Sequence, residues 1–152
     1  MLTNPLFQAV GHGTPTQHNI TTQLKNASVG DTIVIRYHDG GLLDVAESNI
    51  RLANRKNIQI QLNGTFLSAG TMWLGAKNVC VTQQSEFLTH YVSNLFNGER
   101  LASPTITMTE YQPPLLANET RKAYHAHLPS NPFFGPITGR QLINAGQIQE
   151  CI

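Results

Sequence analysis

Hydrophobic and polar positions along the first part of the chain change from one periodicity to another, and each change marks an expected element. Residues 17–27, QHNITTQLKNA, place Ile20, Leu24 and Ala27 on one helical face. Residues 32–38, TIVIRYH, are rich in β-branched side chains, and their nearly continuous apolar start indicates a strand buried on both faces. A helical pattern covers about 42–55, and KNIQIQLNG at 56–64 alternates strictly, as a half-buried strand does.

The alternation of strands and helices continues to residue 92. SAGTMWLGA at 68–76 predicts a short helix, NVCVTQ at 78–83 a strand, and EFLTHYV at 86–92 a short strand carrying His90. This order predicts βαβ units, a largely parallel sheet and right-handed crossovers.

The second part of the chain has a less regular pattern. It is weak at 94–109, and a helix is expected at about 114–128, followed by a loop at 129–136. A last helix at 137–146, with Thr138 as N-cap and Gly146 at its C-terminal end, should precede a strand at 147–152.

The length and charge of the chain narrow the class of protein. A chain of 152 residues suits a single α/β domain spanning 1–152. Only 12% of residues are charged, about half the usual share, and the formal net charge is +1. A low share of charged residues is expected where other subunits cover much of the surface. A surface that is polar but uncharged explains the same composition equally well. The basic residues are scattered, so we expect no nucleic-acid partner.

The expected compartment is the cytoplasm. No apolar run reaches the roughly 18–20 residues that span a bilayer, so no membrane association is expected. The N-terminal residues MLTNPLFQAVGHG lack the basic start and apolar core of a signal peptide. Cys80 and Cys151 could form one disulfide, but without a secretory route we expect both to be free thiols.

A serine between a strand and a helix is the first candidate for chemistry. Ser68 precedes Ala69 and Gly70, small residues that allow close approach of a substrate, and His90 ends the next strand-rich segment. A serine hydroxyl needs a nearby base and donors aimed at the oxyanion that forms. A tight turn exposes the hydroxyl, and the helix N-terminus supplies free N–H groups. The structural alternatives are that Ser68 only caps the helix and that His90 is an ordinary strand histidine.

A glycine pair adds a third element to this pattern. Gly40 and Gly41 follow the strand at 32–38 and precede the next helix, where glycine lets the backbone approach a ligand. One helix and one strand separate them from Ser68, so a βαβ unit would bring the pair beside the serine. On its own, DGG would be read as a plain turn.

The ordered set resembles the Clp-type serine peptidases. IVIRYHDGGLLDVAESNI, LSAGTMWLGAKNVCVTQQSEFLTH and ITGRQLINAGQIQECI are similar to that family's glycine turn and helix, its nucleophile helix and histidine segment, and its C-terminal helix and strand. The resemblance covers about 31–91 and 137–152. It implies a crotonase-like fold of stacked βαβ units. It also implies Ser68 as nucleophile, His90 as general base, and N–H groups of Gly40, Gly41 and Ala69 at the oxyanion.

The resemblance also implies how such a protein works. Its substrates would be peptides or proteins, it would need no cofactor or metal, and its subunits would close into a homo-oligomeric ring, with an unfoldase as a further partner. The segment between His90 and the last helix is short for the family, as expected of a compact version from a phage or a mobile element.

The chain departs from the family at the third member of the catalytic triad. The family has an Asp shortly before FFGPITG, whereas this chain reads HLPSNPFFG, with Asn131 as the candidate. An Asn can accept a hydrogen bond from an imidazole N–H but does not stabilise the imidazolium as an ion does. Two alternatives therefore stay open: a catalytically degenerate subunit with a structural role, and a crotonase-type enzyme acting on acyl thioesters through the oxyanion hole alone.

Overall fold

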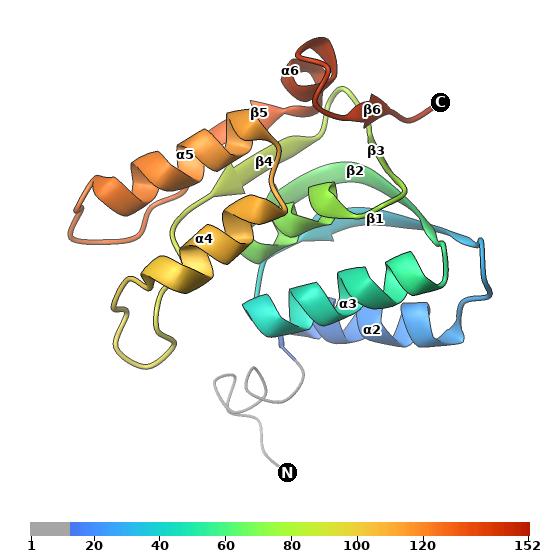
Figure 1. Ribbon diagram of the computed structural model, residues 1–152, viewed down its shortest axis with the longest axis horizontal. Coiled ribbons are helices and arrows are strands. Elements are labelled where there is room, and N and C mark those ends of the chain that lie inside the picture. Colours follow the sequence, from blue (N-terminus) through green and yellow to red (C-terminus); the bar gives the residue numbers. More distant parts are fainter. Residues whose placement is uncertain (1–12) are drawn as a thin grey trace.

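A computed structural model describes residues 13–152 of the chain (Figure 1). The helices in this range are α2 (Pro15–Asn26), α3 (Leu43–Arg55), the 3₁₀ helix η1 (Ser68–Gly75), α4 (Ala102–Glu110), α5 (Pro114–His125) and α6 (Gly139–Asn144). The strands are β1 (Thr32–His38), β2 (Gln59–Leu67), β3 (Val79–Val81), β4 (Glu86–Thr89), β5 (Phe134–Thr138) and β6 (Gln149–Glu150). The expectation that residues 1–13 are not a signal peptide concerns residues that, except for Gly13, lie outside the described range.

The strands form one mixed sheet around β2. Its order is β5-β4-β2-β3-β6, and β1 pairs with the opposite edge of β2. One edge of β2 is shared, because β3 pairs with its first half and β4 with its second. Every pairing is parallel except that of β5 with β4, which is antiparallel. The predicted α/β class and largely parallel sheet are therefore confirmed.

The helices cover the sheet in separate groups. In Figure 1, α2 and α3 lie side by side below β1 and β2, whereas α5 lies along β4, and α4 packs against α5 and η1. Phe66 of β2 and Phe87 of β4 stack in the core with ring centroids 5.3 Å apart. Met72 and Trp73 of η1 are fully buried and form part of the core.

Two elements of the structure were not predicted from the sequence, namely α4 and β5. The helix α4, ASPTITMTE, buries only Thr105 and Met108, so its apolar period is too weak to read from the sequence. The strand β5 contains Gly135 and Pro136, which local patterns assign to loops. It forms because β4 offers a free edge, and pairing with that edge overrides the local preference.

The expectation of two free thiols is wrong. Cys80 and Cys151 form a disulfide, with Cα atoms 4.9 Å apart. The cause is the pairing of β6 with β3, in which Cys80 lies opposite Gln149 and the Cys151 N–H donates to the Val81 carbonyl at 2.9 Å. This register places Cys151 next to Cys80. A strand of two residues has no periodicity, so the sequence pattern does not reveal this pairing.

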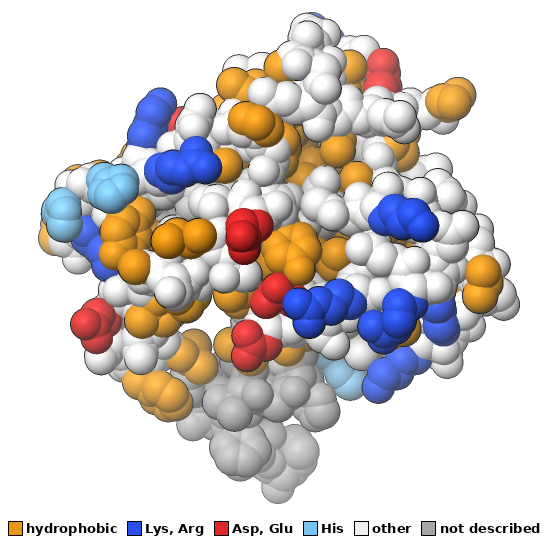
Figure 2. Space-filling view, viewed as in Figure 1, with side chains coloured by type: hydrophobic (Ala, Val, Ile, Leu, Met, Phe, Trp, Pro, Cys, Tyr) orange, Lys and Arg blue, Asp and Glu red, His pale blue; other side chains and the backbone are white. Residues whose placement is uncertain are grey.

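The surface of the described part is weakly charged. Figure 2 shows acidic and basic side chains close together near α3, with mostly uncharged surface around them. One such contact joins Glu47 to Arg51 at 3.6 Å. Across residues 13–152, no helix is both long enough and apolar enough to cross a membrane.

Candidate active site

Three loops meet where the carboxyl ends of adjacent parallel strands lie together. His38 of β1 is opposite Phe66 of β2, and Leu67 is opposite Leu88 of β4. The residues that follow these strands are therefore neighbours: the glycine pair after β1, Ser68 after β2 and His90 after β4. The carboxyl edge of a parallel sheet is where such folds commonly bind ligands.

The glycine turn lies directly against the serine. A Cβ atom added at Gly40 would be 3.1 Å from the Ser68 Cβ and 3.2 Å from the Leu67 carbonyl oxygen. Gly40 also has a φ of +100°, which side chains other than glycine rarely adopt. The glycine pair is thus beside Ser68, as the spacing predicted, and no larger residue fits at position 40 without displacing the serine.

Ser68 occupies a strained turn between β2 and η1. Its φ is +52°, an uncommon conformation for a residue other than glycine. The N-cap of η1 is Leu67, and no side chain caps that helix end. The alternative that Ser68 serves as the helix cap is therefore wrong. Its half-buried hydroxyl makes no hydrogen bond to another residue of 13–152 and is available to a ligand.

His90 lies half-buried just beyond the end of β4. Its ring meets the edge of Phe133, with centroids 4.9 Å apart. Burial lowers the pKa of His90 below its usual value. The ring is therefore neutral at pH 7, which a general base requires.

Asn131 contacts His90, but through a different atom from the one expected. The Asn131 Nδ2 contacts His90 Nδ1 and also donates to the Tyr91 carbonyl at 3.0 Å. The Oδ1 atom is buried and has no hydrogen-bond partner within residues 13–152. Reversing the amide would set two oxygens 3.0 Å apart, so the Tyr91 carbonyl fixes the NH₂ group toward the ring. His90 Nδ1 then accepts a hydrogen bond, and the ring proton is on Nε2.

This tautomer bears directly on the serine chemistry. A base that takes the serine proton needs a lone pair on Nε2, and in serine proteases the triad Asp secures it by accepting the Nδ1 proton. The Ser68 hydroxyl and the His90 ring, both in the described range, are not hydrogen-bonded to each other. In unliganded sites such contacts are often long and tighten only with substrate.

The oxyanion donors expected from the sequence are not equally free. The Gly40 N–H donates to His38 Nδ1 at 3.1 Å. The N–H of Gly41 has no partner within residues 13–152, and that of Ala69 is in the first turn of η1, where no intrahelical acceptor exists. In this conformation Gly41 and Ala69 are the available donors.

Two residues that support the glycine turn escaped the sequence analysis. His38 is buried, and its ring packs against Gly70, where an added Cβ would be 2.8 Å away. Burial lowers the pKa of His38 to about 4, although Asp39 opposes the shift. Gln17 is also buried, and its amide donates to the Leu42 carbonyl and accepts from the Leu42 N–H. Gln17 shares a helical face with Ile20 and Leu24, a signal that could have revealed it.

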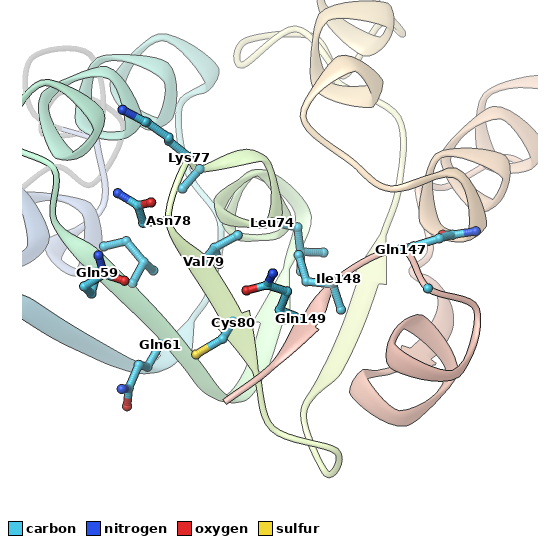
Figure 3. A pocket seen from close by; sticks show the side chains of 13 residues that line it. Gln59, Gln61, Leu74, Lys77, Asn78, Val79, Cys80, Gln147, Ile148 and Gln149 are labelled. Carbon is cyan, nitrogen blue, oxygen red and sulfur yellow. The ribbon is translucent and has the colours of Figure 1, made fainter. Parts of the chain in front are cut away.

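The cleft drawn in Figure 3 lies away from these loops. It has a volume of about 540 Å³ and is lined by the first half of β2, by β3 and by the segment leading into β6. Glutamine side chains from these strands, among them Gln59, Gln61 and Gln149, surround it. No residue of the predicted site lines this cleft.

The described side chains offer no preformed metal site. No group of three or more His, Cys, Asp or Glu residues in 13–152 is arranged to hold an ion. No known protein-family profile matches the chain, and no curated protein sequence matches it.

Proposed function

We propose that this protein is a serine peptidase of the Clp type that cleaves peptide bonds through an acyl-enzyme. The observation that carries the proposal is the meeting of Gly40, Ser68 and His90 at the carboxyl ends of three adjacent parallel strands, with Ser68 at a φ of +52°. Acyl transfer needs a nucleophile, a base and donors to the oxyanion. The Ser68 hydroxyl, the neutral His90 ring just beyond β4, and the free N–H groups after β1 and β2 can supply them.

The reaction follows from these positions. The Ser68 Oγ attacks the scissile carbonyl carbon while its proton passes to His90 Nε2. The N–H groups of Gly41 and Ala69 stabilise the oxyanion, and Gly40 joins them if it turns from His38. Collapse of the intermediate expels the amine, which takes the proton from His90. Water, deprotonated by His90, then attacks the ester, and release of the acid returns the proton to Ser68.

This route requires His90 in the tautomer with the proton on Nδ1. The Asn131 amide favours the other tautomer in the unliganded site, so substrate binding has to include a tautomer change or a reversal of the amide. We therefore expect a slow enzyme, because replacing a triad Asp by Asn costs about 10⁴ in kcat.

The assembly and compartment form part of the same proposal. A homo-oligomeric ring that encloses the serines, fed by an unfoldase in the cytoplasm, suits a chain in which only 12% of the residues are charged. Exposed apolar side chains such as Phe96 and Leu95, which are 75% and 46% exposed, would be covered in such an assembly.

Digestion of a defined peptide mixture tests the proposed activity. Products are identified by mass spectrometry for the wild type, for Ser68→Ala and for Ser103→Ala, which removes an exposed serine of α4. We expect new peptide termini with the wild type and Ser103→Ala but none with Ser68→Ala. Identical cleavage by Ser68→Ala, or no cleavage by a folded, assembled sample, contradicts the proposal.

One observation favours a second candidate, a catalytically degenerate Clp-like subunit with a structural role. The Asn131 NH₂ group faces His90 Nδ1, which is the arrangement least suited to a general base. Such a subunit would yield no cleavage alone but would co-assemble with an active partner, which separates it from the peptidase.

A further inference from the structure

A closed ring of buried hydrogen bonds lies behind the candidate active site. The Gln112 Nε2 donates to Thr89 Oγ1 at 3.2 Å, and the Thr120 hydroxyl donates to Gln112 Oε1 at 2.7 Å. Thr89 and Thr120 are 2.7 Å apart. The Thr120 hydroxyl has two acceptors in reach, and Gln112 Oε1 is nearer than the Leu116 carbonyl at 3.3 Å. With the Thr120 proton on Gln112, Thr89 donates to Thr120. The three side chains therefore form a cycle with one direction, in which each bond polarises the next.

The same amide extends the ring to the nucleophile. The second proton of Gln112 Nε2 is donated to Thr71 Oγ1 at 2.9 Å, and the Thr71 hydroxyl donates to the Ser68 carbonyl at 2.6 Å. Thr71, Thr89 and Thr120 are fully buried, and Gln112 is 7% exposed. Because these side chains are shielded from bulk solvent, breaking one of the bonds leaves a buried polar atom unpaired.

The two hydrogen bonds donated by the Gln112 amide lead to the two parts of the candidate site, the Ser68 turn and the end of β4 before His90. One reaches Ser68 through Thr71 in η1, and the other reaches Thr89, the residue directly before His90 in the chain. Gln112 itself belongs to neither element, because it lies in the connection between α4 and α5. A single carboxamide from outside the sheet thus ties the nucleophile turn to the strand end that delivers the imidazole.

We propose that Gln112 is a positioning residue that sets the separation of Ser68 and His90. The inference rests on the proposed function and adds to it the group that holds the pair in register. Ser68 needs such support, because its φ of +52° persists only where the surroundings impose it. The carbonyl of this strained residue is held by Thr71, and Gln112 holds Thr71.

The test removes the link from Gln112 to Ser68 alone in one variant, and both links of Gln112 in another. Thr71→Val keeps the shape of the side chain but removes the hydroxyl that links Gln112 to Ser68, whereas Thr71→Ser keeps the hydroxyl. Gln112→Met removes both links. Thr105→Val is the matched control, since Thr105 is also buried and also makes two hydrogen bonds, to Leu101 and Val92, neither of which belongs to this ring.

Two readouts are taken from each variant under conditions where it is folded. The first is the rate of covalent labelling by a fluorophosphonate, separated into kinact and KI. The second is the NMR titration of the His90 ring, which does not depend on activity. Misplacement of reacting groups by about 1 Å costs on the order of 10² in rate. We expect kinact to fall about that much in Thr71→Val and Gln112→Met, with KI unchanged and the His90 signal shifted.

The outcomes separate this inference from the proposed function. Thr71→Ser and Thr105→Val should match the wild type in both readouts. If the wild type is not labelled but Thr71→Val still shifts the His90 titration, the peptidase fails and the positioning role stands. If Thr71→Val and Gln112→Met match the two controls in both readouts, the positioning role is overturned, whatever the wild type does.

Discussion

Ser68 and His90 differ in how firmly their surroundings define them. The backbone of Ser68 has a positive φ, and two contacts hold it in place. The Gly40 turn packs against one side, and the Thr71 hydroxyl donates to the Ser68 carbonyl. His90 is defined by Asn131, whose NH₂ group is itself held by the Tyr91 carbonyl. At the scale of single residues, the proposed nucleophile is therefore preorganised, and the proposed base is held in the less reactive tautomer.

Asn131→Asp should make the site faster. A carboxylate at this position accepts the Nδ1 proton of His90 and leaves a lone pair on Nε2, which the amide does not do. We expect the labelling rate of Ser68 to rise on the order of 10² or more, less than a full reversal because the Tyr91 carbonyl still faces the new group. The rate is measured by intact-mass spectrometry.

The pH profile of the same reaction provides an independent check. Because burial lowers the pKa of His90, the wild-type rate should rise with pH to a plateau, with a midpoint below the usual histidine value. The carboxylate introduced by Asn131→Asp stabilises the imidazolium, so the midpoint should move upward in the variant. An unchanged rate and an unchanged midpoint would show that Asn131 does not act on His90.

His38 should make folding stability depend on pH. Its pKa in the folded chain is about 4, below the ordinary value of 6.5, so the unfolded chain binds more protons between these values. Stability is then complete above about pH 6.5 and falls as the pH decreases toward 4, by about 3 kcal/mol. The half-buried His90, whose pKa is also lowered, adds to the same trend.

The measurement is urea unfolding at several pH values in wild type, His38→Gln and His125→Gln. Gln accepts the Gly40 N–H without titrating, so His38→Gln should lose most of the decline. His125 is exposed at the end of α5, and its replacement should leave the decline intact. A His38→Gln variant with the full wild-type decline would rule out the assignment.

At the scale of elements, the site is a product of strand register. The pairing of β1, β2 and β4 brings together three loops that are separated by one whole helix or more in the chain. By contrast, the disulfide depends on β6, whose two residues pair with β3 at the other side of the sheet. The C-terminal end is thus held by a covalent bond more than by its own strand.

Removal of the disulfide should lower stability without altering the site. Cys80 and Cys151 are separated by 71 residues, and a loop of that length favours the folded chain by about 4 kcal/mol in the chain-entropy account. The double variant Cys80→Ala, Cys151→Ala should therefore melt at a lower temperature than the oxidised wild type. Reduced wild type should behave like the variant.

The matched measurement is the labelling rate of Ser68 in the same samples, which should be equal because β6 does not contact the Ser68 turn in the sheet order. Equal melting temperatures for the oxidised wild type and the double variant would show that the cysteines are not bonded in solution.

The sequence predicts long, regular elements best. The strand expected at 32–38 coincides with β1, and the helix expected at 42–55 differs from α3 by one residue at its start. Thr138 caps α6 through its side chain, as predicted, because that signal is local. α4, β5 and the disulfide were not predicted, because each depends on a tertiary partner that the local pattern does not contain.

The candidate site divides in the same way. Ser68 and Gly40 were visible as small-residue turns after strands, and His90 as the end of a strand-rich segment. Chain order and parallel topology already predict that such positions lie close together. The atoms of the Asn131 contact were not visible, because they depend on the Tyr91 carbonyl. Gln112 gave no signal, since it lies between two helices with no periodicity of its own.

At the scale of the whole molecule, the proposed ring leads to a simple expectation. Sedimentation at micromolar concentration should show an oligomer, and the labelling rate per subunit should not fall on assembly, because the serines would line an enclosed but accessible chamber. A monomer at all concentrations that is labelled at Ser68 would retain the chemistry and contradict the ring.

The measurement that most directly tests the central claim is covalent labelling with a fluorophosphonate, located by peptide mass spectrometry. Wild type, Ser68→Ala and His90→Ala are treated side by side, with folding verified for each. We expect a single adduct on Ser68 in the wild type, none in Ser68→Ala, and at most a trace in His90→Ala. A folded, assembled wild type without an adduct, or an adduct that His90→Ala leaves unchanged, would contradict the claim that Ser68 and His90 act together.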